Sequence, residues 1–325
     1  MCSRRLPQIL LLPLLSLPLL GQQTSSADAA PTFRVDQLAL SSHVTVIAYG
    51  DQRFHDHLNF LIANPKARVA LVKKIAQEKP DAVQMSGDVP FKGTDPDDYL
   101  EFANETKPWR DAHLRIYPAL GNHELSGGET KGVDAWWKAF PELQGIRWYS
   151  VALGNRIALI QLDSTSPLTP GSKQINWLRA QLTGLAPSVD FVMISLHHPP
   201  IADIQTEYHV DHNPRANEIA LRDFIAQTAP TLHAAIVVIA GHIHNYERAE
   251  YKGVTYLVSG GGGAEPHKVT RTKGDLYQDP GFPNFHYVKF ELEKDQLKAT
   301  MYRLADPDAN KVKWEEKDHF VIAMK

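Results

Sequence analysis

Five short runs of the chain carry side chains that bind metal ions. They are Gly50-Asp51, Gly87-Asp88, Gly121-Asn122-His123-Glu124, His197-His198-Pro199 and Gly241-His242-Ile243-His244. Carboxylate, amide and imidazole groups are suitable ligands for Zn, Fe, Mn or Co. Each run alone is typical of an ordinary turn or of solvated histidines. Turns have no reason to select this ordered set of ligand types, so together the runs indicate a metal centre.

Each run directly follows an apolar stretch that is expected to be a β-strand. The expected strands alternate with helix-like runs, and this alternation indicates an α/β fold. Open α/β sheets place ligands at the carboxyl ends of their strands, so we expect the five runs to meet at one edge of a sheet. The expected strands are residues 44–49, 81–86, 115–120, 148–153, 156–163, 191–196, 236–240, 255–258, 287–292, 298–303 and 320–323, and the expected helices are 67–77, 99–112, 174–182 and 218–227.

In order and spacing, the five runs resemble the signature of the calcineurin-like metallophosphoesterase superfamily. Further runs are similar to its purple acid phosphatase-like branch, namely Trp148-Tyr149-Ser150, Leu162-Asp163-Ser164, Gln174 to Leu178, and His244-Asn245-Tyr246-Glu247-Arg248. The resemblance covers nearly all of the chain beyond its N-terminal segment. It implies a four-layered αββα sandwich with a metal site at the carboxyl ends of the strands.

The resemblance also implies which residues hold two transition metal ions of Fe, Mn or Zn. A carboxylate has two oxygens and can bridge two cations, which is the role it implies for Asp88. The remaining ligands would divide between the two sites, with Asp51 and His244 in the first and Asn122, His197 and His242 in the second.

The activity that the resemblance implies is hydrolysis of a phosphate ester. Two ions roughly 3.5–4 Å apart lower the pKa of a bridging water, so that a metal-bound hydroxide attacks phosphorus in line. Asp88 and His123 would be the catalytic residues, with His123 as acid or hydrogen-bond donor. Arg53 and His198 would contact the substrate, which we expect to be a phosphomonoester, as for an acid phosphatase. Two alternatives stay open: a phosphodiesterase with the same site, and a degenerate, non-catalytic protein that binds a phosphorylated ligand.

The first metal site departs from both patterns of the family. The wider superfamily has a histidine ligand where this chain has Arg53, and the purple acid phosphatases have a tyrosine ligand where it has Phe91. Neither a guanidinium nor a phenyl ring donates to a metal. We therefore expect a weak first site without a purple phenolate band. His55 is a candidate replacement ligand, and Arg53 is a candidate for holding the substrate phosphate by paired hydrogen bonds.

Three loops, residues 125–132, 167–173 and 205–214, are expected to set the substrate specificity, although their sequences name no substrate. His209 and His212 in the last loop are interpreted as solvated histidines, with a place at the substrate entrance as the alternative. The glycine run at residues 260–263 has two interpretations of equal weight: a close approach of the backbone to the metals or substrate, and a flexible turn.

The N-terminus has the composition of a secretory signal peptide. Arg4 and Arg5 precede an apolar run over residues 10–20 that is too short and too rich in proline to span a membrane. We expect a signal peptide over residues 1–22, with cleavage as late as residue 29. A lead-in over residues 23–43 and one metallophosphoesterase domain over 44–325 would follow. The protein is then expected to be secreted, to the periplasm or to the extracellular medium.

Charge and cysteine content limit the partners. The formal net charge is −3 and becomes −5 if Arg4 and Arg5 leave with the signal, since residues 1–22 contain no acidic side chain. A surface that wraps nucleic acid is therefore not expected, and the expected partner is a small phosphorylated substrate. The single cysteine, Cys2, lies ahead of the apolar run, so the secreted protein would contain no disulfide.

Overall fold

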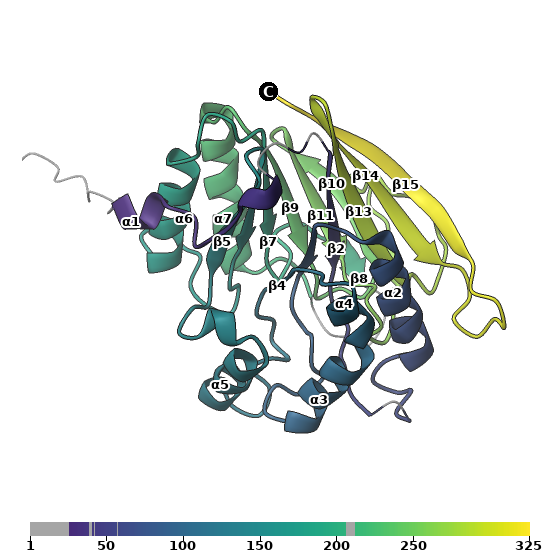
Figure 1. Cartoon of the computed structure of the whole chain (residues 1–325). Helices are drawn as coiled ribbons and strands as arrows, with labels where there is room; N and C mark the ends of the chain where they lie inside the picture. Colours follow the sequence, from purple (N-terminus) through teal and green to yellow (C-terminus); the bar gives the residue numbers. More distant parts are fainter. Residues whose placement is uncertain (1–25, 39–40, 42, 57, 206–211) are drawn as a thin grey trace, which may run out of the picture.

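The computed structural model describes residues 26–38, 41, 43–56, 58–205 and 212–325, and two β-sheets form the centre of this part (Figure 1). The seven-stranded sheet has the order β1 (Phe33–Val35), β5 (Tyr149–Leu153), β6 (Ile157–Gln161), β7 (Phe191–Ser195), β9 (Ala235–Ala240), β11 (Val254–Ser259) and β10 (Tyr246–Tyr251). The six-stranded sheet has the order β15 (Trp314–Ala323), β14 (Gln296–Leu304), β13 (His286–Glu293), β2 (His43–Tyr49), β3 (Ala82–Met85) and β4 (Ile116–Pro118). A separate two-stranded ribbon pairs β8 (Ile204–Gln205) with β12 (Val269–Thr270).

Helices cover the outer faces of both sheets. Figure 1 shows α6 (Lys173–Thr183) and α7 (Ala216–Thr228) beside the seven-stranded sheet, and α2 (Pro65–Glu78) beside the six-stranded one. The layers therefore follow the order helix, sheet, sheet, helix, and the expected αββα sandwich is confirmed. The remaining helical segments are α1 (Ser26–Ala29), η1 (Asp36–Leu38), α3 (Pro96–Glu105), α4 (Lys107–Asp111), α5 (Glu129–Ala139), η2 (Pro141–Leu143) and η3 (Ala229–Thr231).

Two apolar cores hold these layers together. One lies between the sheets and continues under α2, and the other lies between the seven-stranded sheet and helices α6 and α7. Strands β7 and β9 are buried along their whole length, as expected for parallel strands covered on both faces. Their nearly continuous apolar sequences follow from this double burial. Such strands are rigid, so the loops at their ends start from fixed positions.

The parallel strands of both sheets bring the five ligand runs together. Strands β2, β3 and β4 are mutually parallel in one sheet, and β6, β7, β9 and β11 are mutually parallel in the other. The runs follow β2, β3, β4, β7 and β9, and each begins within three residues of the carboxyl end of its strand. The metal-binding residue types therefore lie where the ends of two sheets meet.

Two helix expectations were wrong. The helix expected over residues 99–112 is two helices, α3 and α4, which change over at Thr106. Pro108 in the first turn of α4 has no N–H to donate to the Asn104 carbonyl, and the backbone N–H and hydroxyl of Thr106 both donate to the Phe102 carbonyl. Residues 125–132, expected to be a loop, run into α5, where Val133 and Trp136 are buried. Gly128 at the start of α5 gives no side-chain cap, so the usual signal for a helix start is missing.

The edges of the seven-stranded sheet also differ from expectation. Strand β10 has the polar sequence Tyr-Glu-Arg-Ala-Glu-Tyr and forms only by antiparallel pairing with β11. Strand β1 lies in the expected lead-in and pairs in parallel with β5. The expected signal peptide, residues 1–22, lies outside the described residues. Within the described ranges, no helix is both long enough and apolar enough to cross a membrane.

Candidate metal centre

Three of the predicted ligand atoms gather around one nitrogen of His197. Its Nε2 lies 3.0 Å from Asn122 Oδ1, 3.2 Å from Asp88 Oδ1 and 3.2 Å from His242 Nδ1. The Nδ1 of His197 lies 2.9 Å from the Ser86 carbonyl, so Nδ1 carries the proton and Nε2 carries a lone pair. Two ligands bound at about 2.0–2.1 Å to one tetrahedral cation lie about 3.3 Å apart. The second predicted site therefore has the donor spacing that a transition metal ion requires.

The first predicted site combines Asp51, Asp88 and His244, whose donor atoms all lie within 4.8 Å of one another. His244 Nε2 is 3.5 Å from Asp51 Oδ1, and its Nδ1 faces the Glu265 carbonyl. His244 Nε2 and Asp88 Oδ2 are both buried and have no hydrogen-bond partner. Buried polar atoms are costly unless they are paired or bind a metal, so these two atoms fit a cation between them.

The charges of the two carboxylates agree with this interpretation. Burial raises the pKa of the Asp51 carboxyl well above its usual range, and the charge of Asp88 raises it further. Burial also acts to raise the pKa of Asp88, but His197, His123 and Arg53 outweigh it and lower this pKa to about 2. Without a cation, Asp51 is therefore harder to ionise than an ordinary aspartate, and a bound cation would favour its ionised form.

The histidine ligands are held in the form that binds metal. Burial lowers the pKa of His242 and of His244 well below the usual value of 6.5. Both rings are therefore neutral at neutral pH, and a neutral imidazole offers a nitrogen lone pair to a cation.

The backbone at the centre adopts conformations that side chains normally avoid. Asp51, Arg53, Asp88 and His242 all have positive φ angles, of 61°, 47°, 57° and 71°. Such left-handed conformations persist where the surroundings enforce them, and they concentrate at functional sites. They turn the chain sharply at the strand ends, which directs these side chains inward.

Two glycines allow the ligand loops to pack this closely. A Cβ on Gly121 would lie 2.3 Å from Asp88 Oδ1, and a Cβ on Gly241 would lie 2.3 Å from Asp51 Oδ2. Any side chain at either position would displace a predicted ligand. The glycine run at residues 260–263 likewise approaches the centre, since a Cβ on Gly260 would lie 2.9 Å from Asp51 Oδ2. Of its two interpretations, the structure agrees with the close backbone approach.

Glu124 is a supporting residue to which the sequence pattern assigned no role. Its fully buried carboxylate accepts hydrogen bonds from the backbone N–H groups of Asp88, Val89 and Gly121, at 3.0, 2.8 and 2.7 Å. Burial and the charge of Asp88 raise the pKa of Glu124 to about 8, although the N–H donors act in the opposite direction. Glu124 joins the ends of β3 and β4. Its position directly after Asn122 and His123 was the signal that could have identified it.

His123 lies beside the Asp88 carboxylate. Its backbone N–H donates to Asp88 Oδ1 at 2.9 Å, and its ring Nε2 is 3.9 Å from Asp88 Oδ2. The other ring nitrogen contacts the Phe91 carbonyl. This contact holds the ring with Nε2 toward the centre, where a substrate oxygen would lie.

Arg53 also faces Asp88, with Nη2 3.6 Å from Oδ2 and only 18% of the side chain exposed. Its Nε is buried without a hydrogen-bond partner. His55, the candidate replacement ligand, is directed elsewhere, because its Nδ1 lies 2.6 Å from Asp98 Oδ1. The Phe91 ring packs between the rings of His55 and His123, at centroid distances of 5.1 and 5.4 Å.

His198, expected to contact the substrate, lies against the second site. Its Nδ1 is 2.9 Å from Ser164 Oγ, and its ring centroid is 4.4 Å from that of His242. His198, His197 and His242 form a second group of nitrogens within 4.8 Å of one another. Burial lowers the pKa of His198 to about 2, followed in importance by the charges of His197 and Arg215. His198 is therefore a neutral neighbour of the second site.

Two further histidines line this region. The His267 ring stacks on that of His244 at a centroid distance of 3.9 Å, and His267 Nδ1 accepts the His244 N–H at 3.3 Å. The His212 ring lies 4.5 Å from that of His242 and 5.1 Å from that of His267. His212 is thus packed among histidines and is not simply solvated, while His209 lies outside the described residues. No sequence motif marked His267, because its neighbours are distant in the sequence.

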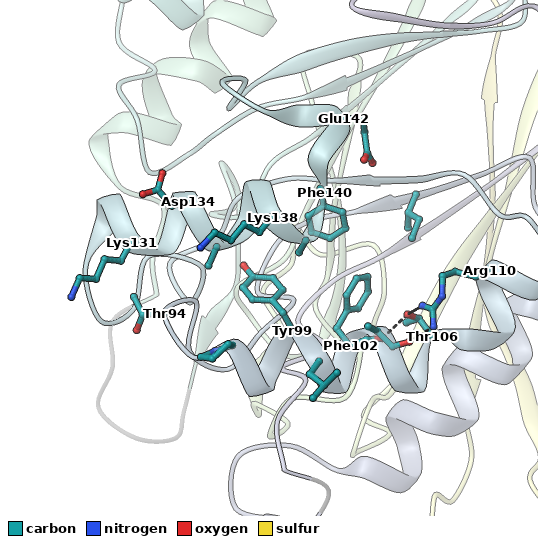
Figure 2. A pocket seen from close by; sticks show the side chains of 16 residues that line it. Thr94, Tyr99, Phe102, Thr106, Arg110, Lys131, Asp134, Lys138, Phe140 and Glu142 are labelled. Carbon is teal, nitrogen blue, oxygen red and sulfur yellow. Dashed lines mark hydrogen bonds between the residues drawn. The ribbon is translucent and has the colours of Figure 1, made fainter.

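A cavity of about 780 Å³ lies apart from this centre, between α3, α4 and α5. Figure 2 shows Tyr99 and Phe102 of α3 opposite Phe140, with Lys131 and Lys138 along α5. None of the predicted metal ligands lines this cavity. The chemistry predicted from the ligand runs therefore belongs to the strand ends and not to this cavity.

Comparison with known proteins agrees with the geometry of the centre. The model of the calcineurin-like phosphoesterase family matches residues 55–246. A probable cyclic nucleotide phosphodiesterase of Rhodococcus erythropolis (strain PR4 / NBRC 100887) is 28% identical over 195 residues, which are 56% of this chain and 57% of the relative.

Solved structures share the fold. The purple acid phosphatase PPD1 from yellow lupin (Lupinus luteus) seeds superimposes with a TM-score of 0.68 at 18% identity, over 88% of this chain and 54% of the lupin chain. GAP50, the anchor in the inner membrane complex of Plasmodium, superimposes with a TM-score of 0.57 at 14% identity, over 87% of this chain and 89% of its own. This chain thus spans little more than half of the Rhodococcus and lupin proteins. The family model matches more than half of the chain, and on this basis the protein belongs to the calcineurin-like phosphoesterase family.

Proposed function

We propose that this protein hydrolyses phosphomonoesters at a centre of two transition metal ions, drawn from Fe, Mn and Zn. The proposed ligands are Asp51, Asp88 and His244 for the first ion and Asp88, Asn122, His197 and His242 for the second. The observation that supports this proposal is the convergence of donor atoms on His197 Nε2, where Asn122 Oδ1, Asp88 Oδ1 and His242 Nδ1 lie at 3.0–3.2 Å. Membership of the phosphoesterase family supports the ester hydrolysis.

When bound, two such ions polarise a phosphoryl group and lower the pKa of a water between them. His123 is the proposed acid. Its ring is fixed through the Phe91 carbonyl, and its Nε2 lies on the Asp88 side of the site. In its protonated form it can give the Nε2 proton to the departing ester oxygen, which then leaves as a neutral alcohol.

Arg53 is the proposed phosphate clamp, and it supports the choice of a monoester. Its guanidinium stands at the Asp88 side of the site, and its buried Nε has no hydrogen-bond partner. A guanidinium presents donors in a planar fork that matches two phosphoryl oxygens. A phosphomonoester carries up to two negative charges at neutral pH and a diester carries one. The positive charge of Arg53 therefore favours binding of the monoester.

A second candidate function is hydrolysis of a cyclic phosphodiester. It is supported by the Rhodococcus relative, which is named as a probable cyclic nucleotide phosphodiesterase and is 28% identical over the matched residues. Its proposed centre would be the same. Only the type of ester, and with it the phosphoryl group that Arg53 binds, would differ.

The deciding experiment compares three substrates on metal-loaded protein: p-nitrophenyl phosphate, bis(p-nitrophenyl) phosphate and 3′,5′-cyclic AMP. We expect kcat/KM for the monoester to exceed that for either diester at least about tenfold, a difference of roughly 1.4 kcal/mol in transition-state binding, with all turnover lost in chelator. A preference for either diester would favour the second candidate. Phosphate binding without turnover under any metal would instead favour a non-catalytic protein.

We further propose that the protein is secreted after removal of residues 1–22, or of a segment ending as late as residue 29. The apolar run over residues 10–20 behind Arg4 and Arg5 supports this proposal. N-terminal sequencing of protein from the host's culture medium or periplasm tests it. Retention of Met1 on the intact protein, or its absence from both fractions, would contradict it.

A further inference from the structure

A cavity of about 230 Å³ lies beside strands β10 and β11, and no predicted ligand of the metal centre lines it. Asp203, Glu247, Tyr256 and Asp275 are among its lining residues. Glu247 belongs to β10, whereas Asp203 directly precedes β8, so the cavity is formed by segments from distant parts of the chain. Carboxylates outnumber guanidinium groups in its wall, which also includes Arg222 and Arg248.

Asp203 and Glu247 are buried there, with only 4% and 5% of their surfaces exposed. In each side chain, one carboxylate oxygen accepts a hydrogen bond from a backbone N–H group. Glu247 Oε2 accepts the Asp203 N–H at 2.6 Å, and Asp203 Oδ1 accepts the Thr272 N–H at 3.1 Å. The second oxygens, Asp203 Oδ2 and Glu247 Oε1, are buried and have no hydrogen-bond partner.

Unpartnered oxygens of this kind are rare in the described part of the chain. Among those residues, three buried carboxylate oxygens lack a hydrogen-bond partner. One is Asp88 Oδ2, in the proposed two-metal centre, and the other two are Asp203 Oδ2 and Glu247 Oε1. A buried carboxylate oxygen without a donor is costly unless a cation or a proton satisfies it. The same feature that fits a cation at Asp88 therefore occurs twice in one cavity.

The neighbouring positive side chains are already engaged by other carboxylates. Arg271 bonds Asp275 at 2.7 Å, and Arg248 bonds Asp318 at 2.7 Å. The other carboxylate oxygen of Asp275 accepts hydrogen bonds from the backbone N–H groups of Arg248 and Tyr277. Within the described residues, neither Asp203 nor Glu247 takes part in an ion pair. Arg222, which also lines the cavity, is paired with Asp223. Each of these guanidinium groups therefore has another carboxylate as its direct partner.

We propose that Asp203 and Glu247 bind one Ca²⁺ ion in this cavity, with water completing its coordination shell. Calcium takes six to eight oxygen ligands and tolerates irregular geometry, so two carboxylates and several waters suit it. Mg²⁺ shares the preference for oxygen but demands near-octahedral geometry. The Tyr256 hydroxyl, also buried without a partner, lines the same cavity and offers a further oxygen.

A proton competes with the cation for these two carboxylates. Burial raises the pKa of Glu247 to about 8, with the charges of Asp203 and Asp275 adding to it. Near neutral pH, the free pair therefore holds a proton, which the ion must displace. Calcium binding should accordingly strengthen as the pH rises toward 8.

The ion would connect the two-metal centre to a neighbouring loop. Glu247 follows His244 in the chain by three residues, and Asp203 leads into β8, which pairs with β12. His267, stacked on His244, lies two residues before β12. A cation held by Asp203 and Glu247 would therefore fix the segment that carries His267 against the strand that follows His244.

Isothermal titration calorimetry with CaCl₂ tests the proposal on protein kept saturated with Mn²⁺ at the two-metal centre. We expect one Ca²⁺ per chain, with a Kd on the order of 10⁻⁴–10⁻³ M as for other extracellular calcium sites. Asp203→Asn and Glu247→Gln, which keep the side-chain shape, should each weaken binding at least about tenfold, a difference of about 1.4 kcal/mol. Asp111→Asn is the matched control, because that carboxylate is 61% exposed and neither it nor its ion-pair partner Lys107 lines the cavity.

A thermal melt of the same four proteins provides a second readout that does not depend on turnover. Calcium should raise the Tm of the parent and of Asp111→Asn, and it should leave the Tm of Asp203→Asn and of Glu247→Gln unchanged. Equal calcium binding by the parent and both cavity variants would overturn the proposal. So would binding of Mg²⁺ in preference to Ca²⁺. A parent that binds neither ion, together with a Glu247→Gln variant of higher Tm, would show that the pair shares a proton instead.

Discussion

At the scale of single residues, backbone carbonyls decide which nitrogen each histidine presents. Ser86 and Glu265 accept from Nδ1 of His197 and His244, so Nε2 of each ring is left for the centre. Such contacts fix the tautomer and the ring orientation of metal-binding histidines. Since the donor atoms converge before any ion is considered, the ligands are preorganised.

Removing a proposed ligand should remove both metal and activity. Asp88→Ala eliminates the carboxylate that faces both ligand groups, and Asn122→Ala eliminates the amide oxygen 3.0 Å from His197 Nε2. We expect each variant to lose measurable turnover and to bind less metal by elemental analysis. Asp97→Ala, at an exposed position of α3, is the control and should keep both. Full metal content in Asp88→Ala would refute its role as bridging ligand.

His123→Ala should separate metal binding from catalysis. The residue faces Asp88 at 3.9 Å but belongs to neither ligand group, so the metal content should stay unchanged. The rate should fall by about 10²- to 10⁴-fold, the usual cost of losing a general acid or base. His233→Ala, at an exposed position, should have no effect on the rate. An unchanged kcat with full metal would exclude His123 from the mechanism.

The first site should bind its ion more weakly than the second. Its group contains three donors, and the guanidinium of Arg53 lies 3.6 Å from Asp88 Oδ2, where its positive charge opposes that of a cation. Elemental analysis of protein purified without added metal should therefore find nearer one ion than two per chain. Phe91→Tyr should raise the iron content by supplying a phenolate. Two tightly held ions and a purple colour in the unmodified protein would contradict this expectation.

At the scale of the elements, the ends of the strands are joined by a few buried side chains. The Glu124 carboxylate accepts hydrogen bonds from backbone N–H groups in the loops after β3 and β4. Arg68 of α2 donates hydrogen bonds to the carbonyls of Arg53 and His55, at 3.1 and 3.2 Å. Arg68 is itself paired with Glu105 of α3. These contacts add to the backbone hydrogen bonds that join the loops after β2 and β3, such as that from the Arg53 N–H to the Asp88 carbonyl at 3.0 Å. The ligand positions therefore depend partly on residues that touch no ligand atom.

Glu124→Gln should weaken metal binding without removing a ligand. The amide keeps the shape but replaces one carboxylate oxygen, an acceptor of backbone N–H groups, with an NH₂ group that cannot accept them. We expect metal affinity to fall on the order of 10- to 100-fold, the range for supporting residues of metal sites. Competition with a chromogenic chelator measures it. Glu142→Gln on η2, which is exposed, serves as the control, and equal affinities in both variants would show that Glu124 only stabilises the fold.

At the scale of the whole molecule, the two sheets are connected by a buried histidine. His286 of β13 lies fully buried, with Nε2 3.0 Å from Ser259 Oγ of β11 and Nδ1 2.8 Å from the Asn284 carbonyl. Burial lowers its pKa from 6.5 to about 4. The folded protein therefore excludes a proton that the unfolded chain accepts.

The stability that depends on His286 should be lost in acid. Between pH 6.5 and 4, the unfolded state binds the extra proton, so the free energy of unfolding falls as the pH falls through this window. The loss has an upper bound of about 3 kcal/mol. Thermal melts at pH 7 and pH 4.5 should show a smaller Tm difference for His286→Gln than for the parent. An equal difference would mean that other groups carry the acid sensitivity.

The sequence by itself determined the α/β character of the fold and placed the ligand runs at strand ends, and the resemblance of these runs to a family implied the αββα layers. The reason is that strands buried on both faces, such as β7 and β9, have nearly continuous apolar sequences that are easy to identify. The metal-binding residue types come shortly after each of these sequences. Helix α5 and strand β10 escaped prediction because neither has local signals. Helix α5 starts without a side-chain cap, and β10 is polar and exists through its pairing with β11.

Only the tertiary structure decided the surroundings of the centre. It brought His267 onto His244 across 23 residues and His212 onto His242 across 30, and it turned His55 toward Asp98. It also placed the carboxylates of Asp203 and Glu247, 44 residues apart, in one cavity. Contacts between segments so distant in the chain depend on how whole sheets pack. A local pattern of residue types carries no record of them.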